Sequence, residues 1–144
     1  MRCEDIMKRD VECIDPTQPV QEAARRMRDA NVGFLPVCDS SRKVLGTITD
    51  RDIAIRIVAE GRPPTTAAAD VMTQEVVACR PDDDVTDAEQ LMGTRQKSRM
   101  IVTDENGCVL GVISLSDIAQ VEEGLRASET MRQVTEREAR PRPH

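Results

Sequence analysis

The sequence predicts an α/β fold of the α+β type, made by internal duplication of a β-α-β-β-α unit. Residues 5–54 align with residues 70–119 at a constant offset of 65 without a gap, and sixteen of the fifty aligned pairs are identical. Both copies end in the form V-L-G-x-I-[ST]-x-x-D-I-A, at residues 44–54 and 109–119. A gapless match of this length indicates duplication, and two such small units are expected to pack as one pseudo-symmetric module.

Composition narrows the classes of function. The chain has 144 residues, 39% of them hydrophobic, with one Phe and no Tyr or Trp, so its core must be aliphatic. Few aromatics and a net charge of −6 argue against binding of a nucleic acid polymer. No apolar run is long enough to span a membrane, and no signal-peptide pattern is present. Five cysteines without a C-x-x-C pair favour a reducing cytoplasm over a disulfide framework.

Each copy is predicted to open with an extended stretch, residues 11–14 and 76–79, ended by a proline two residues later. The polar residues that follow, 17–19 and 82–84, suit a helix N-terminus, where short side chains accept hydrogen bonds from free amides. The three aspartates of residues 82–84 resemble a metal site, but we interpret them as a solvated helix cap. No metal site is expected.

The first helix of each copy has one apolar face. The positions at i, i+3, i+4 and i+7 in copy one are apolar, and copy two repeats the pattern, with a methionine on each face. We interpret these methionines as core residues rather than metal or cofactor ligands. The eight residues are Val20, Ala23, Ala24 and Met27, and Val85, Ala88, Leu91 and Met92.

A hairpin and a second helix complete each copy. The first hairpin strands are predicted at residues 34–38 and 99–103, and the second at 44–49 and 109–114. Short polar turns join them, with the length and residue types of hairpin connections.

The predicted domains follow from this alignment. They are repeat 1 at residues 5–62, a linker at 63–69, repeat 2 at 70–124, and a C-terminal helix with a disordered tail at 125–144. The single histidine, His144, lies in that tail, which removes His-based catalysis and most zinc sites from consideration.

The junction between the last strand and the last helix is the candidate site. Thr49 with Asp52 and Ser114 with Asp117 match the capping box [ST]-x-x-[DE], and capping alone is a sufficient structural explanation. A hydroxyl at a helix N-terminus is also suited to phosphate, and a carboxylate one turn later is suited to ribose hydroxyls. Glycine in the preceding strand, at Gly46 in copy one and at the matching position in copy two, permits close approach of another group.

The duplicated unit, the motif D-[IV]-M near each start and the motif G-x-I-[ST]-x-x-D-I at each end resemble tandem CBS domains, also called a Bateman module. The resemblance covers residues 5–120. It implies that the chain binds an adenine nucleotide (AMP, ADP or ATP) or S-adenosylmethionine in clefts between the repeats, requires no cofactor, forms a homodimer and regulates a protein partner.

By the same resemblance, the two hydroxyls are expected to contact phosphate and the two carboxylates to hold ribose. Strand and opening residues are expected to line the adenine. Besides the four junction residues, the implied binding residues are Phe34, Leu35, Pro36, Cys13 and Arg51 in copy one, and Arg99, Met100, Ile101 and Cys79 in copy two.

The copies differ at positions that matter for binding. Copy two has Ile101 where copy one has Pro36, and Ser116 where copy one has Arg51, whose positive charge suits a phosphate. Lys97 and Arg99 can return positive charge to the second cleft, so unequal sites are expected.

We therefore expect a free-standing regulatory module, not an enzyme, that senses an adenine-containing molecule and signals through a partner or its dimer state. The alternative is a dimerisation scaffold with empty clefts. A third class, a redox or metal sensor, would use cysteines such as Cys13 and Cys79, although buried inert thiols explain these residues as well. An enzyme is disfavoured because no nucleophile-and-base signature is present.

Overall fold

The computed structural model describes residues 1–121 and 125–139, and the chain divides into two compact units. The first-repeat unit contains Asp10–Val76 and Glu105–Val109. The second-repeat unit contains Met1–Arg9, Val77–Asp104 and Leu110–His144. Each unit therefore combines the body of one sequence repeat with the opening segment of the other.

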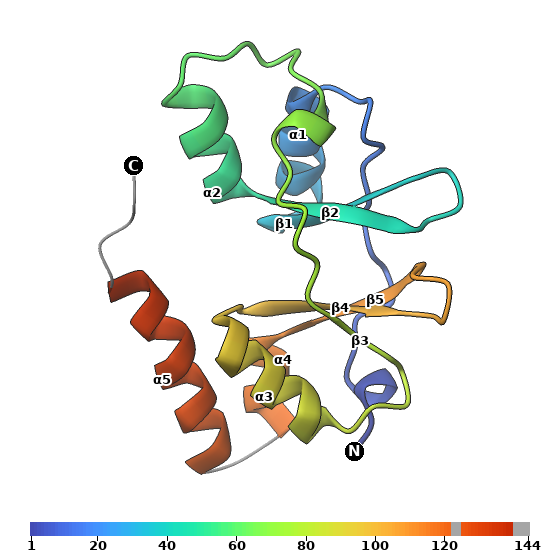
Figure 1. Cartoon of the computed structure of the whole chain (residues 1–144), viewed down its shortest axis with the longest axis vertical. Helices are drawn as coiled ribbons and strands as arrows, with labels where there is room; N and C mark the ends of the chain where they lie inside the picture. The colour runs from blue at the N-terminus through green and yellow to red at the C-terminus, as the bar shows by residue number, and fades with distance from the viewer. Residues whose placement is uncertain (122–124, 140–144) are drawn as a thin grey trace. The chain divides into compact units, whose positions relative to one another are not determined.

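The first-repeat unit is a hairpin covered by helices. Strands β1 and β2 pair antiparallel, and α1 and α2 cover the same face of the hairpin (Figure 1). Leu35, Val37 and Ile48 point from the strands into a core that also contains Ala23 and Met27 of the first helix. The elements are α1 (Val20–Ala30), β1 (Phe34–Cys38), β2 (Val44–Thr49), α2 (Asp50–Ile53), its π-helical continuation η2 (Ala54–Val58) and the turn η3 (Ala68–Asp70).

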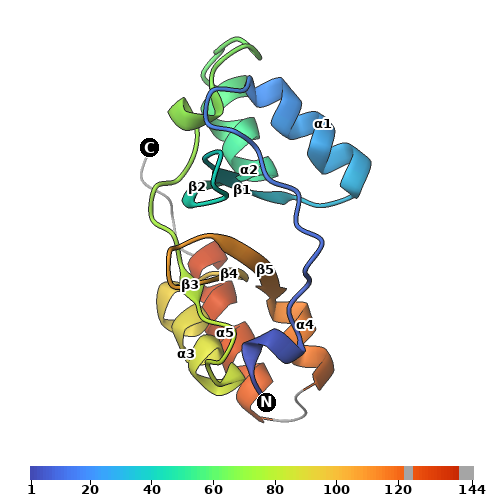
Figure 2. The same cartoon turned by 90° about the vertical axis from the view of Figure 1, so that its right-hand side faces the viewer.

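The second-repeat unit has a three-stranded sheet in the order β3-β4-β5, with β3 parallel to β4. The N-terminal residues lie against this unit (Figure 2): the Cys3 N–H donates to the Asp83 carbonyl over 2.9 Å. The elements are η1 (Cys3–Asp5), β3 (Ala78–Cys79), α3 (Val85–Arg95), β4 (Arg99–Thr103), β5 (Val109–Ser114), α4 (Leu115–Val121) and α5 (Leu125–Ala139). The four predicted hairpin strands are confirmed in both units. No helix among the described residues is long and apolar enough to cross a membrane.

The first amides of α1 and α3 are satisfied in the same way in the two copies. The Val20 N–H donates to the Thr66 carbonyl, and the equivalent Val85 N–H donates to the Met1 carbonyl. Asp84 adds the predicted side-chain cap by accepting from Thr86 N–H over 2.8 Å. In copy one the predicted side-chain cap is wrong, because Pro19 occupies the cap position and has no acceptor in its side chain.

The opening stretch of copy one was predicted as a strand, but in the structure it forms a single parallel bridge, between Ile14 and Val37. In copy two, Ile101 N–H donates to the Val77 carbonyl and extends the pairing into β3. Pro36 occupies the position equivalent to Ile101 and has no N–H to donate. The proline therefore shortens the ladder to one bridge.

The opening segment of each repeat packs closely against a strand glycine. A Cβ at Gly46 would lie 2.7 Å from Sδ of Met72 and 2.7 Å from the Thr73 carbonyl oxygen. A Cβ at Gly111 would lie 2.8 Å from Sδ of Met7. The methionine of each D-[IV]-M motif therefore packs on the strand glycine of the other repeat, and only glycine leaves room for it.

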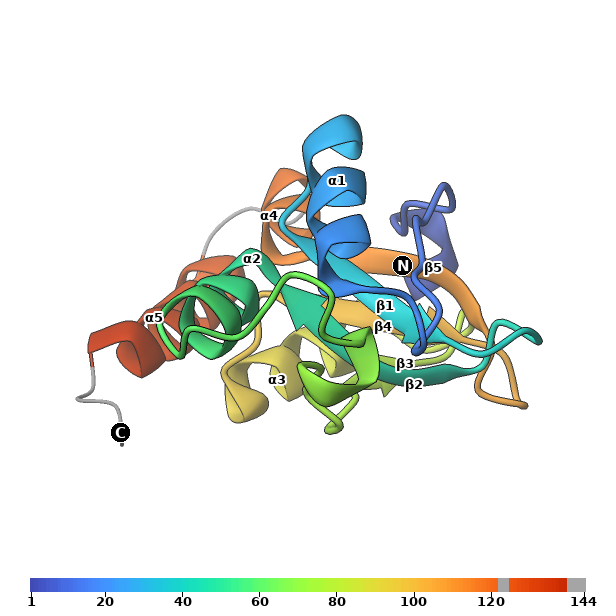
Figure 3. The same cartoon turned by 90° about the horizontal axis from the view of Figure 1, so that it is seen from above.

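The loop between β4 and β5 contributes to the first-repeat unit. Lys43 and Cys108 form an antiparallel bridge, so this loop lies beside the turn after β1, as Figure 3 shows. The turn after β1 is tight: the Asp39 carboxylate accepts hydrogen bonds from the backbone N–H groups of Ser41 and Lys43, and Arg42 has a φ of 67°.

Helix α5 packs on α3. The Thr130 hydroxyl donates to Oε1 of Glu89, whose side chain is buried on α3, over 2.8 Å. Val134 is 3% exposed and joins the core of the second-repeat unit. Gly93 leaves room for Gln133 at this contact. The disordered tail predicted from residue 139 onward falls mainly on residues 140–144, which lie outside the described residues.

Candidate functional site

The first hydroxyl–carboxylate pair is held by reciprocal hydrogen bonds. The Thr49 N–H donates to Oδ2 of Asp52 over 3.0 Å, and the Asp52 N–H donates to the Thr49 hydroxyl over 3.1 Å. This is the complete capping box, and the capping interpretation is confirmed here. It fixes both side chains at the start of α2, and the Asp52 side chain remains 17% exposed.

The second pair has the same geometry. The Ser114 N–H donates to Oδ2 of Asp117 over 2.9 Å, and the Asp117 N–H donates to the Ser114 hydroxyl over 3.1 Å. The Ser114 and Ser116 hydroxyls lie 2.8 Å apart. Ser116 therefore contributes a hydroxyl next to the pair, where copy one has an arginine.

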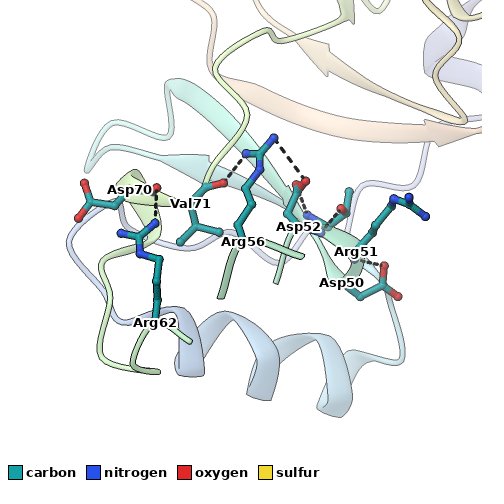
Figure 4. Close-up of polar contacts among 8 residues, drawn as sticks. Asp50, Arg51, Asp52, Arg56, Arg62, Asp70 and Val71 are labelled. Atoms are coloured by element: carbon teal, nitrogen blue, oxygen red, sulfur yellow. Dashed lines mark hydrogen bonds and ion pairs between the residues drawn. The ribbon is translucent and has the colours of Figure 1, made fainter. Parts of the chain in front are cut away.

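A cation lies beside the first carboxylate. Nη2 of Arg56, one helical turn after Asp52, lies 3.8 Å from its Oδ1. Nη1 of the same guanidinium donates to the Val71 carbonyl over 2.6 Å (Figure 4). Arg56 thus connects the candidate ribose carboxylate to the segment that opens repeat 2.

The second carboxylate has a cation from a different element. Nζ of Lys8 lies 3.8 Å from Oδ1 of Asp117, and the lysine backbone exchanges hydrogen bonds of 2.9 and 3.0 Å with Val112. The position equivalent to Arg56 in copy two is Val121, so the helix itself cannot supply this charge.

The positions of Arg56 and Lys8 beside the two carboxylates were not predicted from the sequence. Arg56 had a signal, since its i, i+4 spacing from Asp52 on a helix predicts an ion pair. Lys8 had none, because only tertiary structure brings it to Asp117.

The predicted adenine-lining residues are divided between the site and the cores. Phe34 pairs directly opposite Thr49 and lies at the same end of the hairpin. Leu35 and Met100 are 0% exposed and belong to the two cores. Their side chains cannot line a cleft, which leaves only their backbone groups for that role.

The remaining lining residues are largely buried or lie elsewhere. Pro36 is buried, and Ile101 is 1% exposed. Cys79 is buried with its Sγ 3.5 Å from Sγ of Cys3. Cys13 lies near Cys38, at the end of β1 farthest from Thr49.

The predicted phosphate-binding cations are placed less favourably than Arg56 and Lys8. Arg51 is exposed, and its side chain extends away from Asp52 (Figure 4). Arg99 is exposed at the start of β4, the position equivalent to Phe34. Lys97 donates its N–H to the Met92 carbonyl over 2.9 Å where α3 ends.

The described residues also bear on metal binding. No group of three or more His, Cys, Asp and Glu side chains is close enough to hold an ion within residues 1–121 and 125–139. None of the five cysteines forms a disulfide.

The chain is similar in sequence to a known protein family and to known proteins. The sequence model of the family described as "CBS domain" matches residues 3–59 and 68–124. The CBS domain-containing protein YhcV of Bacillus subtilis (strain 168) is 40% identical over 115 residues, which cover 80% of this chain and 81% of YhcV.

Two solved structures are similar to this chain over more than four fifths of its length. Hypoxic Response Protein I, solved with two coordinated zinc ions, is 27% identical with a TM-score of 0.77, covering 85% of this chain and 100% of that one. The CBS domain pair of protein MJ0100, in complex with 5′-methylthioadenosine and S-adenosyl-L-methionine, is 25% identical with a TM-score of 0.76, covering 84% and 94%.

Proposed function

The chain belongs to the CBS-domain family, and we propose that it is a regulatory module that senses an adenine nucleotide or adenosyl compound. In this proposal Asp52 and Asp117 hold ribose hydroxyls, while Thr49 and Ser114 face a phosphate or the group that replaces it. The output is a change in the dimer state or in the binding of a protein partner, without chemical conversion of the ligand. A reducing cytoplasm fits this role, since none of the five cysteines forms a disulfide.

One observation carries the proposal. The same hydroxyl–carboxylate pair occurs in both copies, held by hydrogen bonds of 2.9–3.1 Å in copy two and 3.0–3.1 Å in copy one. A carboxylate fixed in this way is preorganised to accept hydrogen bonds from vicinal hydroxyls. The adenosyl compounds bound to the similar CBS pair of MJ0100 provide such hydroxyls.

The copies differ in ways that support unequal affinities. Copy one offers Phe34 opposite its hydroxyl and Arg56 beside its carboxylate. Copy two offers Arg99 at the position of Phe34 and Lys8 beside its carboxylate. An aromatic ring favours an adenine face, so we expect the first site to bind uncharged adenosyl compounds more tightly.

Arg56 suggests how binding is transmitted. Its guanidinium contacts Asp52 and the Val71 carbonyl together. When ribose hydroxyls bind to Asp52, the ion pair between Asp52 and Arg56 changes. The hydrogen bond from Arg56 to the Val71 carbonyl, in the segment that opens repeat 2, then changes as well. The ligand then shifts the population of arrangements by its different affinity for each of them.

The test is calorimetric titration of protein freed of bound nucleotide with AMP, ATP, S-adenosylmethionine and 5′-methylthioadenosine. The variants Asp52→Asn and Asp117→Asn keep an oxygen that can accept the capping hydrogen bond but lose the charge. We expect each variant to lose one binding event while its melting temperature stays close to wild type. Loss of folding in both variants would instead mean that these residues serve only as caps.

A scaffold without ligand is the second candidate, and one observation favours it. At both junctions the hydroxyl and the carboxylate already form hydrogen bonds or ion pairs within the chain, and a methionine packs against each strand glycine. Capping and packing are therefore enough to explain them. No heat of binding for any of the four ligands, with an intact dimer in sedimentation, would favour this candidate.

A further inference from the structure

A hollow of about 370 Å³ opens in the first-repeat unit, beside the stretch before α1. It lies at the Cys38 end of β1, whereas Thr49 pairs with Phe34 at the other end. Of the residues proposed to bind the nucleotide, only Cys13 lines it. The other lining residues that matter here are Cys38, Arg26, Arg42, Glu12 and Asp15.

Two cysteines from adjacent backbone segments line this hollow. Ile14 bridges Val37, and the Cys38 N–H donates to the Ile14 carbonyl over 2.9 Å. Side chains alternate along paired strands, so Cys13 and Cys38 project on the face opposite Ile14 and Val37. Both cysteines line the hollow, and each thiol affects the ionisation of the other. Cys38 is 4% exposed, while Cys13 is partly exposed, so an incoming reagent meets Cys13 first.

The surroundings favour a thiolate at Cys13. The hydrogen bond from Cys38, with the nearby charges of Arg42 and Arg26, lowers the pKa of Cys13 to about 7 against the opposing effects of burial and Glu12. The same hydrogen bond raises the pKa of Cys38. A thiol whose pKa is near the ambient pH combines a large thiolate fraction with good nucleophilicity.

We propose that this hollow is a thiol–disulfide exchange site for low-molecular-weight, peptide-like disulfides, with Cys13 as the attacking thiol and Cys38 as the resolving thiol. The Cys13 thiolate forms a bond to one sulfur of the bound disulfide, and the other sulfur leaves as a thiolate. Cys38 then loses its proton to solvent and attacks Cys13, which releases the second thiolate. The two cysteines are oxidised by two electrons, and the small disulfide is reduced to two thiols.

The charges around the hollow indicate the class of disulfide. Arg42 has no ion-pair partner among the described residues, and it lines the same hollow as the acids Glu12, Asp15 and Asp39. A zwitterionic peptide disulfide carries carboxylates for the arginine and ammonium groups for the acids. The proposal does not rest on nucleotide binding.

The chain contains a matched control pair. Cys3 and Cys79 also contact each other, with their Sγ atoms 3.5 Å apart, but they are 0% and 7% exposed. The hydrogen bond from Cys79 lowers the pKa of Cys3, while burial and the charges of Asp83, Asp84 and Asp87 oppose this effect. This pair has a thiol–thiol contact in which both side chains are buried, whereas Cys13 is partly exposed.

The first experiment exposes the reduced, full-length protein at pH 7 to glutathione disulfide, with acid quenching and mass mapping of tryptic peptides. Cys13 lies in peptide 10–25 and Cys38 in peptide 29–42, so their cross-link is identified directly. We expect this cross-link to form at least about tenfold faster than any modification of Cys3 or Cys79. Equal rates for the two pairs in the native protein would overturn the proposal.

Variants test the roles of the two thiols and of Arg42. In Cys38→Ser the reaction should stop at a glutathionylated Cys13. In Arg42→Gln the reaction with glutathione disulfide should be about threefold to tenfold slower than in wild type. Because Arg42 also lowers the pKa of Cys13, Arg42→Gln should slow the reaction with neutral bis(2-hydroxyethyl) disulfide slightly, by about twofold and less than the reaction with glutathione disulfide. An unmodified Cys13 in Cys38→Ser would refute the attacking role, and equal slowing of both reagents would refute recognition by Arg42.

Discussion

Nζ of Lys8 lies 3.8 Å from Oδ1 of Asp117, although the two residues come from opposite ends of the sequence. In the other copy, Nη2 of Arg56 lies at the same distance, 3.8 Å, from Oδ1 of Asp52. Each proposed ribose carboxylate is therefore partly neutralised by one cation. Because the two cations come from different elements, each can be removed without touching the other site.

Lys8→Gln tests this neutralisation. The lysine side chain is 75% exposed, so the free energy of unfolding should change by no more than about 0.5 kcal/mol. An uncompensated Asp117 should repel an anionic ligand, so the affinity of the second site for AMP should fall roughly threefold to tenfold. Titration with AMP and with uncharged adenosine separates the effects, and Arg9→Gln is the matched control. Equal losses for both ligands would mean that the lysine acts by packing.

Thr49→Ala tests the capping box. It removes the acceptor of the Asp52 N–H, and we expect the free energy of unfolding to fall by about 0.5–2 kcal/mol. Thr49→Ser keeps the hydroxyl and should recover most of this loss in urea denaturation. A serine variant as unstable as the alanine variant would show that the threonine methyl, and not the cap, carries the stability.

Gly46→Ala tests the packing of the opening segment. The added methyl meets Met72 and the Thr73 carbonyl, so we expect a loss of roughly 1–3 kcal/mol in the free energy of unfolding. The double variant with Met72→Ala should lose less than the sum of the two single variants, because the side-chain clash is then removed. Strict additivity would contradict the contact.

The duplicated core was predictable from the sequence because its pattern is local. Residues 34–38 form a short apolar run, residues 44–49 are rich in β-branched residues, and a polar turn separates the two. The structure forms β1 and β2 over those ranges. The reciprocal bonds of Thr49 and Asp52 follow from a spacing of three residues at a helix start.

Other features depend on residues that are distant in the sequence. Pro36 shortened the opening strand by withholding an N–H from a segment more than twenty residues earlier. Gly46 was interpreted as room for an approaching group, and in the structure Met72 occupies that room. The contact between α5 and α3 includes the Glu89–Thr130 hydrogen bond, and no periodicity in the sequence indicates that pairing.

Val134→Ala tests whether α5 is part of the second-repeat unit. The side chain is 3% exposed in the core, so its truncation should cost roughly 1–3 kcal/mol of unfolding free energy. Met131→Ala on the same helix changes a side chain that is 48% exposed and should cost about 0.5 kcal/mol or less. Thermal denaturation of both variants makes the comparison, and equal effects would argue that α5 does not pack as described.

The central claim is that Asp52 and Asp117 hold the ribose hydroxyls of an adenosyl ligand. The most direct measurement compares the affinities of AMP and 2′,3′-dideoxy-AMP for wild type, Asp52→Asn and Asp117→Asn. A hydrogen bond to a charged group is worth about 1.5–3 kcal/mol, so removing the hydroxyls should weaken binding to wild type roughly tenfold to a hundredfold. At the substituted site the same removal should have little further effect. Additive losses, with the hydroxyls mattering equally in wild type and in both variants, would contradict the claim.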